Sequence, residues 1–308
     1  MSRFPGNKNF AFSIFDDTDN STLECISPVY HLLQELGFRT TKSVWPLAAA
    51  PGARFGGATL QDADYLEWIH ELRHAGFEIG LHNVRSGSAP REVVQRGLEE
   101  FRIRIGEYPR VHANHSDNRE NIYWGSSRLS RPFSRLAYDL ASLCRGRENF
   151  SGHLPSSEFF WGDICKDRLR FVRNFVFDEI NLERINPTLP YHDPRKPFVN
   201  FWFSSCEGAD VAKFCKMISE PNQDRLAAES GICIMYTHFA SGSFRDGKVH
   251  PVFERLMRRL SKLNGWFVPV SELLEFLLAG KKQSTIPAGE LRRMENRWIR
   301  YKMRAGRC

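Results

Sequence analysis

Short apolar runs and amphipathic stretches alternate along the chain. In the first part of the chain, strands are predicted over residues 10–17, 39–47, 78–84 and 110–116, and the first of these is an apolar run typical of a buried strand. The stretches between them carry apolar side chains every three or four positions, which predicts helices over residues 23–38, 62–77 and 90–106. A regular alternation of strand and helix indicates a parallel sheet that helices cover.

The alternation stops after Asp117 and resumes beyond Asp163. Residues 118–163 are rich in aromatic side chains and contain one predicted helix, from about Phe133 to Leu143, so we interpret this segment as an insertion or an elaborated loop. The later strands are expected in residues 169–181, 196–205 and 231–242, the later helices in 208–220, 222–230 and 250–265, and a last strand that runs into a helix in 265–280.

Seven or eight strands in a chain of 308 residues favour one β/α barrel over two nucleotide-binding domains. The phosphate-binding pattern G-x-G-x-x-G does not follow the first strand, and G-x-x-x-x-G-K-[ST] is absent from the sequence. We therefore expect one barrel domain over residues 1–280, with the basic residues 281–308 as a helix or tail.

Composition indicates a globular protein with a large aromatic core. Apolar residues make up 42% of the chain and charged residues 26%, and there are 24 Phe. The seven Cys form no C-x-x-C pair, which argues against a zinc ribbon or a redox pair and fits buried thiols in a reducing compartment. The N-terminus lacks the apolar segment of a secretory signal, and no apolar stretch is long enough to span a bilayer. We therefore expect a cytoplasmic protein.

Positive charge is concentrated near the C-terminus. The net charge is +7, and residues 281–307 contain nine Lys or Arg side chains against two acidic ones, Glu290 and Glu295. A solvated surface helix explains this pattern, and weak contact with an anionic membrane or a phosphorylated substrate is the functional alternative. No nucleic-acid recognition motif accompanies these charges, so we expect no nucleic-acid partner.

Acidic and imidazole side chains fall near the C-terminal ends of four predicted strands. They are Asp16 and Asp17 on the first strand, His82 on the third, His112 and His115 on the fourth, and His238 on a late strand. Because the reactive groups of parallel β/α folds collect at this end of the strands, we expect them on one rim. One carboxylate with two imidazoles suits a divalent metal ion, and a second carboxylate can act as a base on water.

Four segments lie in an order that is known from one family. AFSIFDDTD (11–19) is an apolar strand that ends in Asp-Asp, and AGFEIGLHN (75–83) is a helix end and strand that lead to a His. CIMYTHFASG (233–242) and GWFVPVSELLEFL (265–277) follow as a strand with a terminal His and a last strand with its helix. Together they resemble the polysaccharide deacetylases, the carbohydrate esterase family 4 group. The resemblance implies a distorted (β/α)7 barrel, a zinc or other divalent ion, and removal of acetyl groups from N-acetylated sugars.

The resemblance also implies roles for individual residues. Carried over position by position, Asp16 is the general base, and Asp17 and His82 bind the metal. His238 is the general acid beside the leaving group, while Asp19 is left to a turn or a helix cap. The leading function is therefore metal-dependent deacetylation of an N-acetylated sugar or sugar-containing precursor.

The sequence departs from the family pattern at three places. Thr18 stands where the first motif continues with Gly, and Ser86 stands where the second motif has another His. The third motif, an Arg followed by Pro and an aromatic residue, is replaced by HANHSDN (112–118). The missing metal ligand is expected from the fourth strand, where His115 is favoured over His112 because it lies nearer the end of the strand.

Aromatic residues in the insertion are candidates for contact with a sugar ring. Trp124 and Trp161 offer flat faces on which a pyranose ring stacks. For a cytoplasmic enzyme, a nucleotide-linked or lipid-linked sugar precursor is the favoured substrate.

Two other functions stay open at this point. A metal-independent glycoside hydrolase would pair Asp16 with a second carboxylate, for which Asp163, Asp178 and Glu179 are the candidates. A deacetylase fold without catalytic activity would serve only in binding.

Overall fold

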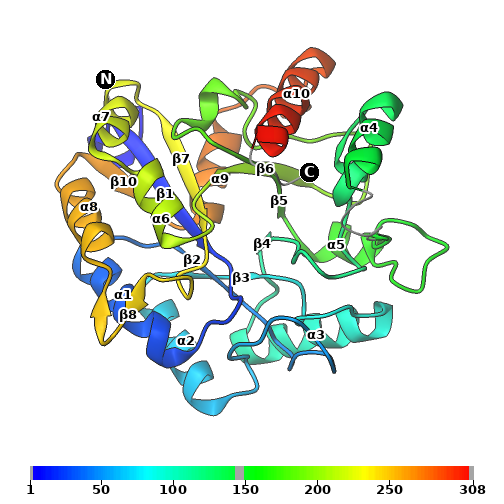
Figure 1. Cartoon of the computed structure of the whole chain (residues 1–308), viewed down its shortest axis with the longest axis horizontal. Helices are drawn as coiled ribbons and strands as arrows, with labels where there is room; N and C mark the ends of the chain where they lie inside the picture. The colour runs from blue at the N-terminus through cyan, green and yellow to red at the C-terminus, as the bar shows by residue number, and fades with distance from the viewer. Residues whose placement is uncertain (1–2, 143–148, 305–308) are drawn as a thin grey trace.

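Parallel strands close into a barrel, as the alternating pattern predicted. The computed structural model describes residues 3–142 and 149–304. The strands follow one another around the ring from β1 to β7, β1 also pairs with β7, and every pairing in this sheet is parallel (Figure 1). The barrel strands are β1 (Phe10–Asp16), β2 (Thr41–Val44), β3 (Glu78–Leu81), β4 (Val111–His112), β5 (Phe171–Phe177), β6 (Phe201–Cys206) and β7 (Ile232–Thr237).

Strand β1 has neighbours along both of its edges. Along one edge, residues 11–16 pair with residues 232–237 of β7. The other edge is shared, because residues 10–12 pair with β10 (Gly265–Phe267) and residues 15–16 pair with β2. The C-terminal end of β1, where the acidic residues lie, is therefore held between β2 and β7.

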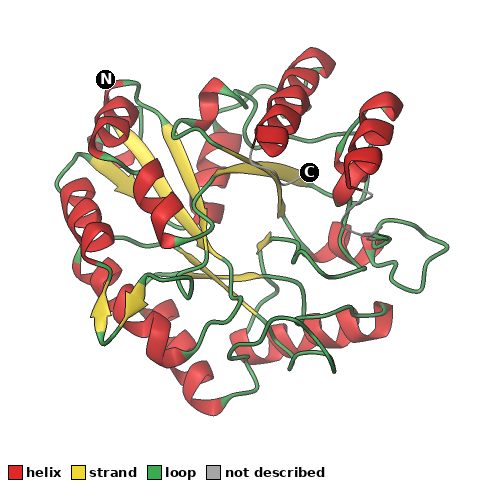
Figure 2. Ribbon diagram, viewed as in Figure 1, coloured by secondary structure: helices red, strands yellow, loops and turns green. Residues whose placement is uncertain are grey.

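Helices surround the ring of strands (Figure 2). Their apolar residues face the sheet, and in α1 the buried set includes Ile26, Val29 and Leu33, at the spacing that the sequence predicted. The helices that follow the barrel strands are α1 (Leu23–Glu35), α2 (Ala63–His74), α3 (Arg91–Ile105), α6 (Val211–Met217), α7 (Glu220–Ala228), α8 (Pro251–Ser261) and α9 (Val270–Ala279). A short hairpin of β8 (Phe244–Arg245) and β9 (Lys248–Val249) precedes α8.

In the parts of the chain that the structure describes, no helix is both long and apolar enough to cross a lipid bilayer.

The segment between β4 and β5 contains α4 (Pro132–Ser142), α5 (Gly162–Arg168) and a 3-10 turn at Gly125–Arg128. The helix predicted near Phe133 is therefore present, and its predicted last residue, Leu143, lies outside the described residues. A Cβ atom on Gly152 would lie 1.8 Å from the carbonyl oxygen of Glu120, so only glycine permits the close approach of these two parts of the segment.

The basic C-terminal segment forms helix α10 (Ala288–Arg304), which packs against the barrel and the long segment before β5. Leu291, Met294 and Trp298 are buried on one face of the helix. Glu295, also buried, accepts hydrogen bonds from the backbone N–H and the hydroxyl of Ser130. The apolar face of α10 therefore belongs to the core, while its five arginines are exposed. A role for these charges in membrane contact stays a prediction.

Two methionines of α10 test whether this helix contributes to the stability of the barrel. Met294 is fully buried, whereas Met303 is 67% exposed. We expect Met294→Ala to lower the free energy of unfolding by about 2–5 kcal/mol, because it removes apolar contacts and leaves a cavity. Met303→Ala is the matched control, with an expected change of about 0.5 kcal/mol or less. Urea denaturation followed by tryptophan fluorescence measures both, and equal small losses would show that α10 is only loosely attached.

Candidate active site and metal centre

The C-terminal ends of four barrel strands bring an aspartate and three histidines together. His82 directly follows β3, His238 directly follows β7, and Asp19 lies three residues beyond β1. Strand β4 ends at His112, so His115 lies in the loop beyond it rather than on the strand. Parallel strands place these ends on one rim, which is why residues far apart in the sequence meet there.

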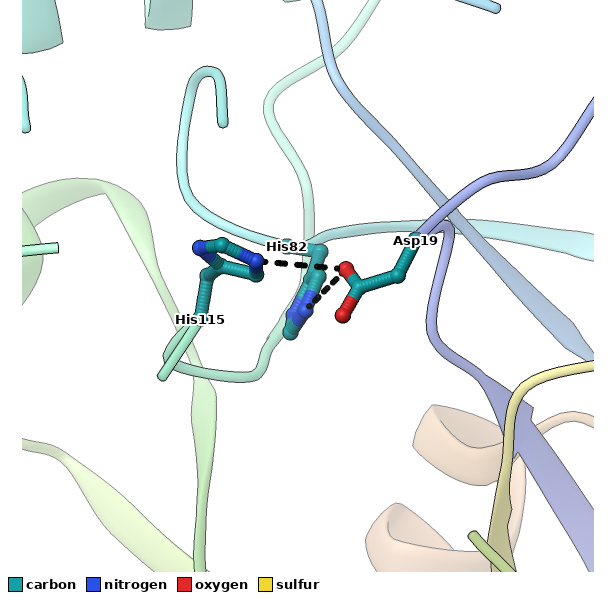
Figure 3. A group of neighbouring side chains, drawn as sticks. All are labelled: Asp19, His82 and His115. Atoms are coloured by element: carbon teal, nitrogen blue, oxygen red, sulfur yellow. Dashed lines mark ion pairs between the residues drawn. The ribbon is translucent and has the colours of Figure 1, made fainter. Parts of the chain in front are cut away.

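Asp19 lies at the centre of this group. Its Oδ1 atom is 3.2 Å from Nε2 of His82 and 3.4 Å from Nε2 of His115 (Figure 3). Its Oδ2 atom is 3.3 Å from Nε2 of His238. One carboxylate therefore faces the same ring nitrogen of three histidines.

The other ring nitrogen of each histidine faces an oxygen. Nδ1 of His82 lies 3.0 Å from the carbonyl oxygen of Ala113, Nδ1 of His115 lies 2.8 Å from Oδ1 of Asn118, and Nδ1 of His238 lies 2.9 Å from the carbonyl oxygen of Ala209. Because these oxygens accept hydrogen bonds, Nδ1 carries the hydrogen in each ring. In the neutral form of each ring, Nε2 then keeps its lone pair, as a metal ligand requires.

Asp19, His82 and His115 fit a divalent metal ion. Their ligand atoms all lie within 4.8 Å of one another. In a tetrahedral site with bonds of about 2.0–2.1 Å, neighbouring ligand atoms are about 3.3 Å apart, which lies between the two Asp19–imidazole distances. Among the described residues, the buried Oδ1 of Asp19 and Nε2 of His115 have no hydrogen-bond partner. A cation between these atoms would satisfy both of them.

The charges of the group are mutually stabilised. Burial alone would raise the pKa of Asp19, but the surrounding imidazoles hold it well below its usual range. Burial would lower the pKa of His238, yet Asp19 and the charge of Asp17 outweigh this effect and raise the pKa to about 9. Asp19 raises the pKa of His115 in the same way against the effect of burial. A metal ion would replace protons as the countercharge of Asp19.

Asp17 is held from the far side of the barrel by Arg173 of β5. Nη1 and Nη2 of Arg173 donate to the two carboxylate oxygens of Asp17 at 2.9 and 2.5 Å. Burial would raise the pKa of Asp17, but the charge of Arg173 outweighs this effect and lowers the pKa, so Asp17 is ionised at neutral pH. Oδ2 of Asp17 also lies 3.8 Å from Nε2 of His82 and 4.0 Å from Nε2 of His238. Each carboxylate oxygen accepts more than one hydrogen bond, so Asp17 can still accept one from a ligand.

A cavity of about 270 Å³ opens beside these groups, and His115 is not among the side chains that line it. Asp17, Asp19, His82 and His238 contribute the polar part already described. The wall also includes side chains from the long segment before β5 and from α10, namely Trp124, Arg128, Trp298 and Lys302. The cavity therefore joins the strand ends to two elements outside the regular barrel.

Three solved structures resemble nearly the whole chain. Two are proteins assigned as polysaccharide deacetylases: one from Pseudomonas aeruginosa PAO1 (12% identity, TM-score 0.51, 90% of this chain and 93% of that one) and one from Mycobacterium smegmatis (12%, 0.50, 92% and 96%). The third is the allantoinase PuuE (13%, 0.50, 90% and 93%). The chain has the polysaccharide deacetylase fold. No family model matches the sequence, and no curated protein matches it either.

Asp16, which the sequence predicted as the general base, does not reach the cavity. It is fully buried, and its Oδ2 lies 2.9 Å from Nζ of Lys42, which is also fully buried. The Tyr30 hydroxyl donates to Oδ2 at 3.2 Å, and the backbone N–H of Phe239 donates to Oδ1 at 2.9 Å. Asp16 is not among the residues that line the cavity. Its position therefore differs from the predicted role of general base and matches that of a buried structural ion.

The other two acids also differ from the expected order. Asp17 was expected to bind the metal, but Arg173 contacts both of its oxygens. Asp19 was expected in a turn or a helix cap, but it meets the imidazoles. The residue that caps α1 is Thr22, whose side chain accepts a hydrogen bond from the backbone N–H of Cys25. The carboxylate in the candidate metal site is therefore two positions further along the chain than the sequence predicted.

His112 and Trp161 lie outside the cavity. His112 is fully buried, and its Nε2 lies 3.3 Å from Oδ1 of Asn114. Trp161 is 1% exposed, packs edge-on against His112 and donates from Nε1 to the carbonyl oxygen of Glu120 at 2.6 Å. It offers no free face to a sugar. Trp124, in contrast, is half-buried and lines the cavity.

The carboxylates considered for a glycoside hydrolase do not meet at the cavity. Asp163 pairs with Arg91, Glu179 pairs with two arginines, and Asp178 is exposed. Neither these three residues nor Asp16 line the cavity. The arrangement therefore gives no support to that alternative.

Sequence reasoning missed Arg173 and the place of Asp19. Arg173 lies inside the apolar run FVRNFVF, and a charge in a buried strand requires a partner of opposite charge. This signal was present, but it did not identify Asp17 as the partner. The three acids of FDDTD are too close in sequence for periodicity to separate their roles.

The buried pair of Asp16 and Lys42 provides a test of its structural role. We expect Lys42→Met to lower the free energy of unfolding by about 3–5 kcal/mol, because it leaves the buried Asp16 carboxylate unpaired. The control is Arg104→Met, which breaks a more exposed pair with Glu100 and should cost no more than about 1 kcal/mol. Urea denaturation measures the free energy of unfolding of both variants. A loss for Lys42→Met as small as that of the control would contradict the structural role.

Proposed function

We propose that this chain is a metal-dependent hydrolase that removes an acetyl group from an N-acetylated sugar. The observation that carries the proposal is the group of Asp19, His82 and His115 beside the cavity. Nε2 of both histidines faces the carboxylate, and Nδ1 of both is fixed by another oxygen. The assigned activity of two structural neighbours agrees with this proposal.

In this proposal, Asp19, His82 and His115 hold a divalent ion, with zinc as the first candidate. When bound, such an ion polarises an acyl carbonyl and lowers the pKa of water. The ligand set differs from the one expected from the sequence only in its carboxylate, which is Asp19 in place of Asp17.

Asp17 is proposed as the general base. It lines the cavity, it is ionised at neutral pH, and Arg173 fixes the orientation of its carboxylate. In the reaction, Asp17 accepts a proton from the water that attacks the amide carbonyl carbon. Arg173 is then a positioning residue, since it acts through Asp17.

His238 is proposed as the general acid. The Ala209 carbonyl oxygen fixes the hydrogen of Nδ1, so the second proton of the charged ring is on Nε2, which faces Asp17 and Asp19. Without a metal ion, Asp19 and Asp17 raise the pKa of His238 to about 9. When Asp19 binds the ion, Asp17 still faces Nε2 of His238 at 4.0 Å and favours the protonated ring. His238 donates this proton to the nitrogen as the C–N bond breaks, and acetate and a free amine leave.

Asp16 supports this acid indirectly. Its Oδ1 accepts a hydrogen bond from the backbone N–H of Phe239, the residue after His238. The buried ion pair with Lys42 therefore anchors the end of β7 that carries the acid.

Substitution of Asp19 tests the metal site. We expect Asp19→Asn to weaken zinc binding by more than about 100-fold. Loss of a residue that only hydrogen-bonds a metal ligand typically costs about 10- to 100-fold in affinity, and loss of the ligand itself costs more. Isothermal titration with zinc measures the affinity after treatment with a chelator, and the visible spectrum of the cobalt-loaded protein reports the coordination. Asp246→Asn, in the exposed turn between β8 and β9, is the matched control. Wild-type protein that binds neither zinc nor cobalt would contradict the proposal and favour a binding protein without catalysis.

Substitution of the proposed base and acid tests the chemistry. We expect Asp17→Asn and His238→Ala each to lower kcat by about 100- to 10,000-fold, because each removes a proton-transfer group. Release of acetate from oligomers of N-acetylglucosamine measures the rate, and the zinc content of each variant shows whether the metal is retained. His74→Ala, at an exposed position of α2, is the control. Full activity of either variant would exclude the role given to that residue.

A further inference from the structure

Arg128 is a buried cation whose guanidinium has no acidic partner among the described residues. It ends the 3-10 turn Gly125–Arg128, lines the cavity, and is only 6% exposed. Among the described residues, its buried Nε and Nη2 atoms have no hydrogen-bond partner. No ion pair joins its guanidinium to an acidic side chain in the described parts of the chain. A buried charge in this condition is costly unless a ligand satisfies it.

Two tryptophans fix the orientation of the Arg128 side chain. The guanidinium carbon lies 3.1 Å from the centroid of the Trp124 ring and 5.3 Å from that of Trp298. Contact of a guanidinium with aromatic faces leaves the N–H groups at its edge free to donate. These edge N–H groups suit the two oxygens of a carboxylate or a phosphate.

The acidic side chains of the cavity are engaged elsewhere. Asp17 contacts Arg173, and Asp19 faces the imidazoles. Glu207 accepts hydrogen bonds from the Tyr301 hydroxyl at 2.7 Å and from the backbone N–H of Ala209 at 3.0 Å. None of these carboxylates forms an ion pair with Arg128.

The cation is also not alone in this part of the wall. Lys302 lines the same cavity, with its ammonium group 5.8 Å from the centroid of the Trp298 ring. Burial lowers the pKa of Arg128 to about 9, so the side chain still carries its charge at neutral pH. The part of the wall formed by Trp124, Trp298, Arg128 and Lys302 is therefore a positively charged, aromatic subsite, which we call the cationic subsite.

We propose that the cationic subsite binds an anionic group of the substrate, a carboxylate or a phosphate, and that Arg128 is the main residue that contacts this group. The inference rests on the proposed deacetylase function and narrows its substrate to a negatively charged N-acetylated sugar. The volume of about 270 Å³ is near the lower end of the range for small-molecule sites, about 300–1,000 Å³, and suits one sugar unit with its substituent. The acetamido group would lie at Asp19 and the anion at Arg128.

The first experiment compares neutral and anionic probes on the zinc-loaded wild-type protein. The probes are N-acetylglucosamine, its 1-phosphate, its 6-phosphate, and the uronic acid of the same sugar. We expect kcat/KM for acetate release to be about 10- to 100-fold higher for at least one anionic probe than for the neutral sugar. This is the gain in affinity, about 10- to 100-fold, that hydrogen bonds between two charged groups typically give. The phosphate and uronic acid arms distinguish the two sources of negative charge. Equal kcat/KM for all four probes would overturn the inference and leave the proposed function standing.

The second experiment assigns the preference to Arg128. We expect Arg128→Met to remove the advantage of the anionic probe, and Arg128→Lys to restore part of it, since lysine keeps the charge but not the planar fork. Arg135→Gln, at an exposed position of α4, controls for the loss of one positive charge. Thermal denaturation should show Arg128→Met to be at least as stable as the wild type, because the substitution removes an unpaired buried charge. A large loss of stability with an unchanged preference for anions would mean that Arg128 is structural and would overturn the inference.

Binding without turnover separates this inference from the proposed function. Isothermal titration of the preferred anionic probe into metal-free wild type and metal-free Arg128→Lys reports the cationic subsite alone. We expect binding to the wild type that weakens about 10-fold or more in the variant. Such a result would support the inference even if the zinc-loaded protein released no acetate, in which case only the proposed function would fail. No difference between wild type and Arg128→Lys would contradict the role of Arg128.

Discussion

Three carboxylates at the end of one buried strand repel one another unless each has a separate cation, and the structure meets this constraint acid by acid. Asp16 has Lys42 of β2, Asp17 has Arg173 of β5, and Asp19 has the imidazoles that follow β3, β4 and β7. The partners thus lie on, or just beyond, five of the six other barrel strands. The acidic run of β1 is consequently the point at which electrostatic attraction ties the barrel strands together across its interior.

The same constraint explains why neighbouring acids take different roles. Asp16, which is fully buried with Lys42, has no access to the cavity. Asp17 is ionised, and its two hydrogen bonds from Arg173 fix the orientation of its carboxylate. Only the third, beside neutralisable imidazoles, has a countercharge that a metal ion can replace. The chemistry of the site therefore depends on which cation faces each acid, and less on the acids themselves.

Much of the fold was predictable because strand and helix periods are local properties of the sequence. The barrel class and the meeting of strand ends followed from the alternation of the two patterns, and His82 and His238 directly follow their strands as predicted. The division of roles among Asp16, Asp17 and Asp19 was not predictable, because it depends on side chains from distant strands. Arg173 carried a signal as a charge within an apolar strand, whereas Lys42 lies in the mostly polar stretch TKSV, and the partners of both could be identified only in three dimensions.

Helix α10 gives the cavity an unusual order of assembly. The proposed metal ligands lie within residues 19–115, whereas Trp298 and Lys302 come from the last described helix. During synthesis from the N-terminus, the strand ends with the ligands therefore emerge long before the wall that covers Arg128. A nascent chain that stops before Ala288 contains the proposed metal ligands but lacks the contribution of α10 to the cavity. The proposed metal site and the proposed cationic subsite therefore depend on parts of the chain that are synthesised at different times.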